Sequence, residues 1–132
     1  MSADKFWSCF YEIYEALPRQ GPGDRESTGR ALRLLPTLTR GQRILDISCG
    51  AGTQTIDLAL ATEAQIVAVD NHPPFVAQLA RRAAELNLGE RLTAQVGDMN
   101  ELHELRRMTS YARSDWTPCL QDFEWGLTTA IS

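Results

Sequence analysis

The sequence has few cysteines, no surplus of positive charge and no apolar run long enough to span a bilayer. Its three cysteines, Cys9, Cys49 and Cys119, lack the paired spacing of a zinc site or disulfide framework, so we expect reduced thiols and no bound metal. The formal net charge of −4 argues against a general grip on nucleic acid or on a membrane surface and favours a small neutral or cationic partner. Without a signal-peptide pattern at the amino terminus, a cytoplasmic location is the default expectation.

A strand, a glycine turn and a helix follow one another in the middle of the chain. The 132 residues are 43% hydrophobic, enough for the core of one domain. Residues 43–47 are apolar enough for a short buried strand, and Gly50-Ala51-Gly52 ends it before apolar residues resume at helical spacing. Glycines permit a sharp turn and leave no side chain between a ligand and the peptide groups, while the helix directs its free N–H groups there. We therefore expect a small polar ligand at this turn.

The residues of this turn also carry a family resemblance. Asp46-Ile47-Ser48-Cys49-Gly50-Ala51-Gly52 resembles the first motif of the class I S-adenosylmethionine-dependent methyltransferases, D-x-G-C-G-x-G, with Ser48 where glycine is common. The resemblance implies an α/β, Rossmann-like fold, a parallel sheet flanked by helices, with S-adenosyl-L-methionine as cofactor. In that family the glycine loop lies against the methionine part of the cofactor and the acidic residue orients it. The residues so implied are Asp46, Ser48, Cys49, Gly50 and Gly52.

A carboxylate stands where a nucleoside ligand would need one. Residues 65–70 read as a second buried strand, and Asp70 ends it about twenty residues after the glycine turn. That spacing places a carboxylate beside a ribose, where it can accept hydrogen bonds from both hydroxyls. The alternative is that Asp70 caps the next helix. Asn71 is also counted among the predicted cofactor residues, and it could take over the capping while residues 72–74 fix the turn.

A third strand, residues 91–96, follows a helix over residues 74–88 whose Arg81 and Arg82 are expected to face solvent. In the resembled family, the acidic residue after this strand bonds the adenine amino group and the next residue contacts the ring. The resemblance gives these roles to Asp98 and Met99. Loops at the carboxyl ends of three neighbouring strands would then converge on one ligand, as is usual in open α/β sheets.

The amino-terminal leader is predicted to form two helices joined by a Pro- and Gly-rich loop. The first, residues 4–17, has an apolar face that we expect to pack; the second, residues 25–38, is capped by Asp24. Its predicted inward residues are Ala31, Leu34, Leu35 and Leu38. The sequence of residues 10–23 resembles the leader of a bacterial subgroup of small-molecule-type methyltransferases. That implies a lid over the cofactor cleft, with Arg19 and Gln20 near its mouth; the alternative is a surface hairpin that only covers the sheet.

The sequence after residue 102 departs from the family. Residues 106–114 are a poor buried strand, and the three strands that should follow the fourth are missing, so we expect an incomplete, shortened fold. The expected layout is a single domain over residues 1–132, with a lid (1–40), a cofactor-binding core (41–102) and an atypical tail (103–132). Without a fourth strand, the apolar edge of residues 43–47 would be open. We expect the tail or a second copy of the chain to pair with that edge.

The function implied by the resemblance is transfer of the sulfonium methyl group to an unidentified, small-molecule acceptor, in which alignment of the reactants supplies much of the acceleration. Tyr11, Tyr14, Arg19 and His103 are candidates near the acceptor, but none has a neighbour that makes it a catalytic base, so no catalytic residue is assigned. One alternative is a truncated, non-catalytic cofactor-binding remnant. Another is a nucleotide-dependent oxidoreductase domain, disfavoured by Thr55 where a dinucleotide loop has its third glycine. A third is an interaction module with an empty loop.

Overall fold

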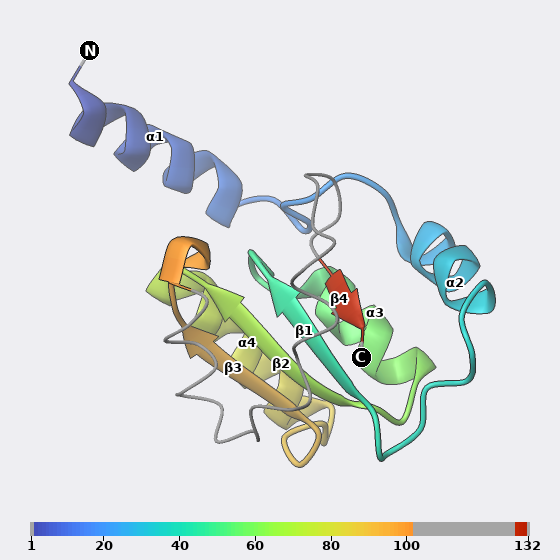
Figure 1. Ribbon diagram of the computed structural model, residues 1–132. Helices are drawn as coiled ribbons and strands as arrows, with labels where there is room; N and C mark the ends of the chain where they lie inside the picture. The colour runs from blue at the N-terminus through green and yellow to red at the C-terminus, as the bar shows by residue number, and fades with distance from the viewer. Residues whose placement is uncertain (1, 102–128, 132) are drawn as a thin grey trace.

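The computed structural model describes residues 2–101 and 129–131 (Figure 1). Two leader helices precede an alternation of strands and helices, and the strands form one four-stranded sheet in the order β3-β2-β1-β4. The elements are α1 (Ala3–Glu15), α2 (Arg25–Arg33), β1 (Arg43–Ile47), α3 (Thr53–Ala61), β2 (Gln65–Asp70), α4 (Pro73–Glu85), β3 (Leu92–Val96), the short 3₁₀ helix η1 (Met99–Glu101) and β4 (Thr129–Ile131).

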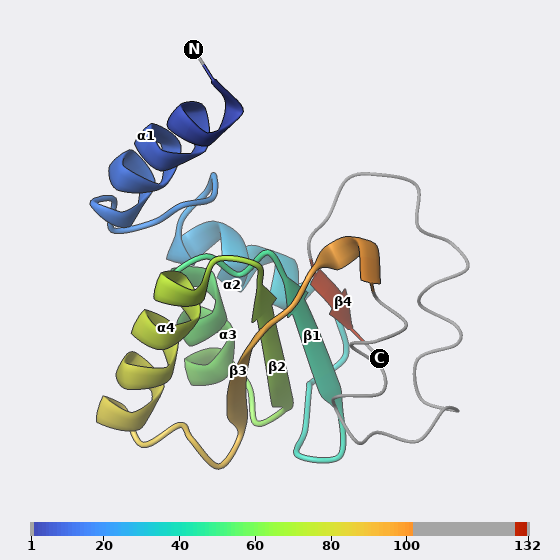
Figure 2. The ribbon, with the colours of Figure 1, turned by 90° about the vertical axis from the view of Figure 1, so that its left-hand side faces the viewer.

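The three strands β1, β2 and β3 are parallel, which confirms the predicted Rossmann-like core. β2 lies in the centre, paired with β1 through Ile66 and Ile44 and with β3 through Ile66 and Leu92. Five of its six residues are buried, as a central parallel strand requires. Helices α3 and α4 lie together on one face of the sheet (Figure 2). Their apolar sides close a core in which Ile44, Ile66 and Leu79 are almost fully buried.

The open edge of β1 is covered by the end of the chain. Strand β4 pairs antiparallel with β1, with Ile131 opposite Ile44 and Thr129 opposite Asp46 (Figure 1). The expectation that the tail would lie along this edge is therefore confirmed for residues 129–131. Pairing satisfies backbone groups of β1 that would otherwise remain free to bind another chain. Residues 106–114, where a fourth parallel strand was considered, lie outside the described residues, as do His103 and Cys119.

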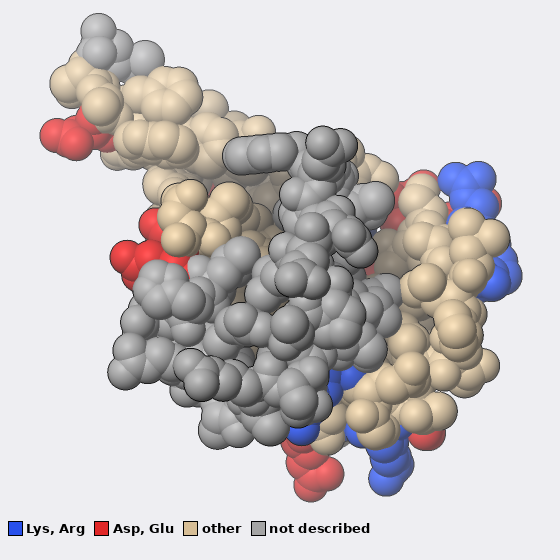
Figure 3. All heavy atoms as spheres, in the orientation of Figure 1, with Lys and Arg blue, Asp and Glu red and all other residues tan. Residues whose placement is uncertain are grey.

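Helix α1 is held differently from the core. It projects away from the sheet (Figures 1 and 2), and none of its residues is buried. Phe6 and Trp7 are about half exposed, so the expectation that the stripe packs into the protein is wrong for this end of the helix. The rings contact one another instead, with the Phe10 and Tyr14 centroids 4.1 Å apart. Figure 3 shows mostly uncharged surface on α1.

Within residues 2–101 and 129–131, no helix combines the length and apolar content needed to cross a membrane.

Helix α2 is shorter than predicted and turned differently. The Asp24 cap is confirmed, since its Oδ1 accepts a hydrogen bond from the Ser27 N–H at 2.8 Å. The helix ends at Arg33, however, because Pro36 disfavours helical backbone at the residue before it. Thr28 is buried and Leu32 packs against the core. Of the predicted inward residues, only Leu38 is buried; those that are exposed are Ala31, Leu34 and Leu35.

Candidate cofactor site

The glycine loop between β1 and α3 contains three residues with left-handed backbone. Ser48, Gly50 and Gly52 have φ angles of 59°, 58° and 79°. Ser48 therefore has the left-handed backbone that glycine adopts most easily, which explains why glycine is common at this position in the family. For a serine this conformation costs about 1 kcal/mol or more of folding free energy. A Cβ on Gly52 would lie 2.2 Å from Leu79 Cδ1. The second glycine of the motif is thus required by the packing of α4 against the start of α3, in addition to its backbone angle.

Asp70 ties the end of β2 to the glycine loop. Its Oδ2 accepts a hydrogen bond from the Gly50 N–H at 2.9 Å, and its Oδ1 accepts one from the His72 N–H at 2.9 Å. A carboxylate can accept about four hydrogen bonds, so acceptor capacity remains for a ligand. The predicted capping by Asn71 is wrong, because His72 is the N-cap of α4 and makes no side-chain capping bond. Asn71 is exposed beside Asp70.

Asp46 lies beneath the loop and bonds to the protein. Only 4% of it is exposed, and its Oδ2 accepts a hydrogen bond from Thr55 Oγ1 at 2.7 Å. Burial raises the pKa of Asp46 to about 6, with a further contribution from the Asp70 charge, although the Thr55 hydrogen bond opposes the rise. This role of Thr55 was not among the predictions. The sequence signal for it is a hydroxyl residue, Thr55, in the first turn of the helix that follows the strand carrying Asp46.

Cys49 is a partly buried thiol in the same loop. Burial raises the pKa of Cys49 well above its usual range, and the charges of Asp46 and Asp70 raise it further. The thiol therefore stays protonated at neutral pH and is a poor nucleophile. Cys9 and Cys49 are both free thiols, as expected.

The leader loop lies directly on the glycine loop and on the start of α3. Gln20 Oε1 accepts a hydrogen bond from the Ala51 N–H at 3.0 Å, and Thr53 Oγ1 donates one to the Pro18 carbonyl at 2.6 Å. Arg19 Nη1 lies 3.4 Å from Asp57 Oδ2 in α3. Arg19 and Gln20 therefore lie beside the predicted cofactor loop.

Arg82 in α4 also reaches this loop. Its Nη1 lies 3.2 Å from both the Ala51 carbonyl and Thr53 Oγ1. The prediction of a solvated face is therefore wrong for Arg82, whereas Arg81 is exposed. Helical periodicity places Arg82 next to the buried Ala83. It does not show that this part of α4 lies beside the glycine loop, which is a matter of tertiary packing.

Asp98 and Met99 follow β3 at the same edge of the sheet. The Gly97 N–H donates to the Asp70 carbonyl at 3.0 Å, which fixes the end of β3 against the end of β2. Asp98 Oδ1 accepts a hydrogen bond from the Asn100 N–H at 2.8 Å. Asp98 and Met99 are exposed at the start of η1, which stands beside the strand ends in Figure 1. Their side chains remain accessible to a ligand at this edge.

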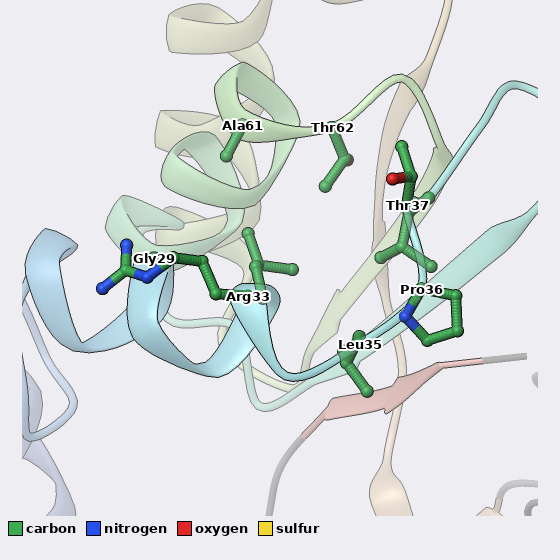
Figure 4. A pocket seen from close by; sticks show the side chains of 9 residues that line it. Gly29, Arg33, Leu35, Pro36, Thr37, Ala61 and Thr62 are labelled. Atoms are coloured by element: carbon green, nitrogen blue, oxygen red, sulfur yellow. The ribbon is translucent and has the colours of Figure 1, made fainter.

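A cavity of about 470 Å³ lies elsewhere. Figure 4 shows its walls, formed by the end of α2, the segment leading to β1 and the end of α3. The described lining residues include none of the predicted cofactor residues; they are Gly29, Leu32, Arg33, Leu35, Pro36, Thr37, Leu38, Ala61 and Thr62. The polar groups gathered at the strand ends therefore remain the candidate site.

The chain is similar to known methyltransferases. A family model described as a methyltransferase domain matches residues 44–120, more than half of the chain. The chain is 33% identical over 67 residues to a probable cobalt-precorrin-6B C(15)-methyltransferase (decarboxylating) of Pyrobaculum aerophilum, covering 49% of this chain and 34% of that protein. Residues 44–120, which the family model matches, contain the glycine loop, Asp70, Asp98 and Met99.

Two solved structures share the fold. YjhP from E. coli is 28% identical with a TM-score of 0.60, over 67% of this chain and 36% of that one. A SAM-dependent methyltransferase of Thiobacillus denitrificans, solved with S-adenosyl-L-homocysteine, is 23% identical with a TM-score of 0.61, over 68% and 36%.

The chain spans about a third of the length of these relatives. The family match favours the methyltransferase interpretation over the oxidoreductase interpretation, in agreement with Thr55 in place of a third glycine. The glycine loop, the three parallel strands and the matched region agree with one another. The chain therefore belongs to the methyltransferase domain family, with the class I fold that its glycine motif predicted.

Proposed function

We propose that the chain binds S-adenosyl-L-methionine at the carboxyl edge of its sheet, for methyl transfer to a small-molecule acceptor. The observation that carries the proposal is the 2.9 Å hydrogen bond between Asp70 Oδ2 and the Gly50 N–H. This bond brings the acceptor predicted for a ribose and the loop predicted for the methionine part into direct contact. In open α/β sheets, ligands bind outside the carboxyl ends of the strands, which is where these two groups lie.

The residues at this edge suit the parts of the cofactor. Asp70 is 8% exposed and offers a charged acceptor to the ribose hydroxyls, and bonds to a charged acceptor are among the stronger ones. Asp98 can accept from the adenine amino group, and Met99, 48% exposed, offers an apolar surface to the ring. Gly50, whose N–H bonds Asp70, belongs to the loop proposed to hold the methionine part. The bound cofactor would supply an electrophilic methyl group, and the chain's contribution would be to hold it in position.

The acceptor is proposed only by class. The net charge of −4 favours a small neutral or cationic molecule over nucleic acid, and a cytoplasmic location fits the free Cys9 and Cys49. S-adenosyl-L-homocysteine is the natural probe, because the Thiobacillus denitrificans relative was solved with it. No residue is proposed as a catalytic base.

The test is calorimetric titration of the folded chain with S-adenosyl-L-homocysteine. Wild type should bind saturably, and Asp70→Asn should weaken binding by more than tenfold, since hydrogen bonds to a charged group contribute about 1.5–3 kcal/mol. Gly50→Val should weaken binding strongly, because its φ of 58° disfavours a branched residue and a changed loop would displace the Gly50 N–H from Asp70. Asp24→Asn, at the exposed cap of α2, is the matched control and should bind as wild type does.

The outcomes separate the functions considered. Absence of saturable heat from folded protein would overturn the proposal, and tighter binding of a nicotinamide dinucleotide would favour an oxidoreductase. Binding without methyl transfer to any of a panel of small amines, phenols and carboxylates would favour the non-catalytic cofactor-binding alternative. Methylation of one of them, detected as release of S-adenosyl-L-homocysteine, would identify the acceptor class.

A further inference from the structure

Gln20 joins the leader helix to the glycine loop through a single side chain. Its Nε2 donates hydrogen bonds to the carbonyls of Tyr14 and Leu17 at 3.0 and 2.9 Å. These carbonyls lie in the last turn of α1 and just beyond it, and that of Tyr14 also accepts a hydrogen bond from the Leu17 N–H at 3.2 Å. Its Oε1 accepts a hydrogen bond from the Ala51 N–H at 3.0 Å. Both amide hydrogens of Gln20 are therefore directed to α1, and its oxygen to the loop.

Gly50 gives Gln20 the space for this contact. A Cβ on Gly50 would lie 3.0 Å from Gln20 Oε1 and 3.1 Å from Gln20 Cβ. The glycine predicted to admit a ligand thus also admits the leader's carboxamide. Any group that fixes the conformation of the loop at residues 50–52 fixes the position of the Ala51 N–H that Gln20 needs.

The rest of the attachment of α1 consists of a few specific contacts near the same site. Glu15 Oε1 lies 2.6 Å from His72 Nε2, and the Tyr11 ring stacks on His72 with a centroid distance of 3.7 Å. His72 follows Asp70 by two residues, and its N–H is bonded to the Asp70 carboxylate. Because α1 contributes no buried residue, its docking depends on these contacts and on Gln20.

We propose that Gln20 is a positioning residue that couples the docking of α1 to occupation of the cofactor loop. The inference rests on the proposed function, since it requires the cofactor to bind at residues 50–52. A bound cofactor favours the loop conformation that presents the Ala51 N–H, and this conformation favours the docked leader. Thermodynamic linkage then requires the docked leader to raise cofactor affinity by the same factor.

The experiment measures amide hydrogen exchange over residues 3–17 of the full chain, with and without saturating S-adenosyl-L-homocysteine, together with its calorimetric affinity. In wild type the ligand should slow exchange in α1. In Gln20→Leu the ligand should bind roughly three- to tenfold more weakly, the range expected for one hydrogen bond, and should leave exchange in α1 unchanged.

Two further variants make the test specific. Gln20→Glu retains an acceptor for the Ala51 N–H but has no donor for the α1 carbonyls at neutral pH. It should therefore fail to slow exchange in α1 and, because the coupling is reciprocal, should bind the ligand about as weakly as Gln20→Leu does. Gln42→Leu removes another carboxamide whose oxygen accepts from a backbone N–H, that of Thr39, at the amino end of β1. It should behave as wild type in both measurements.

The result that would overturn the inference is ligand binding that leaves α1 exchange unchanged in wild type, or ligand-dependent slowing that persists in both Gln20 variants. In either case the proposed function would stand. If wild type binds no ligand at all, the proposed function itself fails. Should Gln20→Leu not fold, as judged by circular dichroism, Gln20→Glu alone decides between coupled and uncoupled leader docking.

Discussion

The leader and the core of this chain are held by different forces. Helix α1 has no buried residue, whereas the nine-residue helix α3 buries Thr55, Ile56, Leu58 and Ala59. The core depends on apolar burial, which is cooperative, and helix α1 depends on individual polar and ring contacts. Loss of the contacts of α1 should therefore cost the sheet little stability. Each prediction below pairs a position in the core with one in the leader.

The largest difference is expected between two glycines with similar backbone. Gly52 and Gly23 have φ angles of 79° and 88°. Alanine at Gly52 would place its Cβ 2.2 Å from Leu79 Cδ1, so strain and overpacking should lower the free energy of unfolding by roughly 3–5 kcal/mol. Alanine at Gly23 has only Ser27 Cβ nearby, at 3.8 Å, and should cost about 1–2 kcal/mol. Urea unfolding measures both, and equal losses would show that the α3–α4 contact is loose.

The next largest difference is expected between two phenylalanines. Phe75 in α4 is 4% exposed and Phe6 in α1 is 46% exposed. Phe75→Ala should destabilise the protein by about 3 kcal/mol or more, because a large buried side chain leaves a cavity. Phe6→Ala should change the free energy of unfolding by less than about 1 kcal/mol. A large effect of Phe6→Ala in thermal unfolding would mean that α1 belongs to the cooperative unit.

Asp46 and Asp24 should give opposite pH dependences. The folded-state pKa of Asp46 is about 6, above its ordinary value of 3.8, so the folded protein holds this proton more tightly. Stability from Asp46 therefore falls as pH rises from about 4 to 6, by up to about 3 kcal/mol. Asp46→Asn, which can still accept from Thr55, should be more stable than wild type at pH 8 and similar to it at pH 4.

Asp24 provides the control for this prediction. Hydrogen bonds from the Ser27 backbone and side chain lower the pKa of Asp24, so its contribution is present above pH 3.8 and is lost as pH falls through the lowered value. Asp24→Asn should accordingly lose stability relative to wild type at pH 8 and not near pH 2, as followed by urea unfolding. Parallel pH profiles for the two variants would contradict the burial of Asp46.

The smallest effect concerns reactivity without any change in stability. Cys9 in α1 is exposed, whereas burial raises the pKa of Cys49 in the glycine loop. Iodoacetamide at pH 8 should modify Cys9 in the native protein and modify Cys49 only after unfolding, as read by peptide mass spectrometry. Rapid native modification of Cys49 would show that the glycine loop opens to solvent.

The core was largely predictable because its signals are local. Residues 43–47 and 65–70 were expected as strands and form β1 and β2, and the third strand differs from its prediction by one residue. Apolar runs, the glycine turn and the Asp70 spacing are each contained in a short window. The end of α2 was misplaced because amphipathic periodicity continues past Arg33, while Pro36 stops the helix.

The sequence by itself determined the strand, turn and helix order, the glycine loop and the acidic residues at the strand ends, since these follow from nearest neighbours along the chain. Only the tertiary structure decided that Gln20 caps the Ala51 N–H, that Arg82 reaches the same loop and that Thr55 bonds Asp46. Gln20 and Arg82 each lie 31 residues from Ala51. Long polar side chains find such partners through the packing of whole elements, and no local pattern in the sequence specifies that packing.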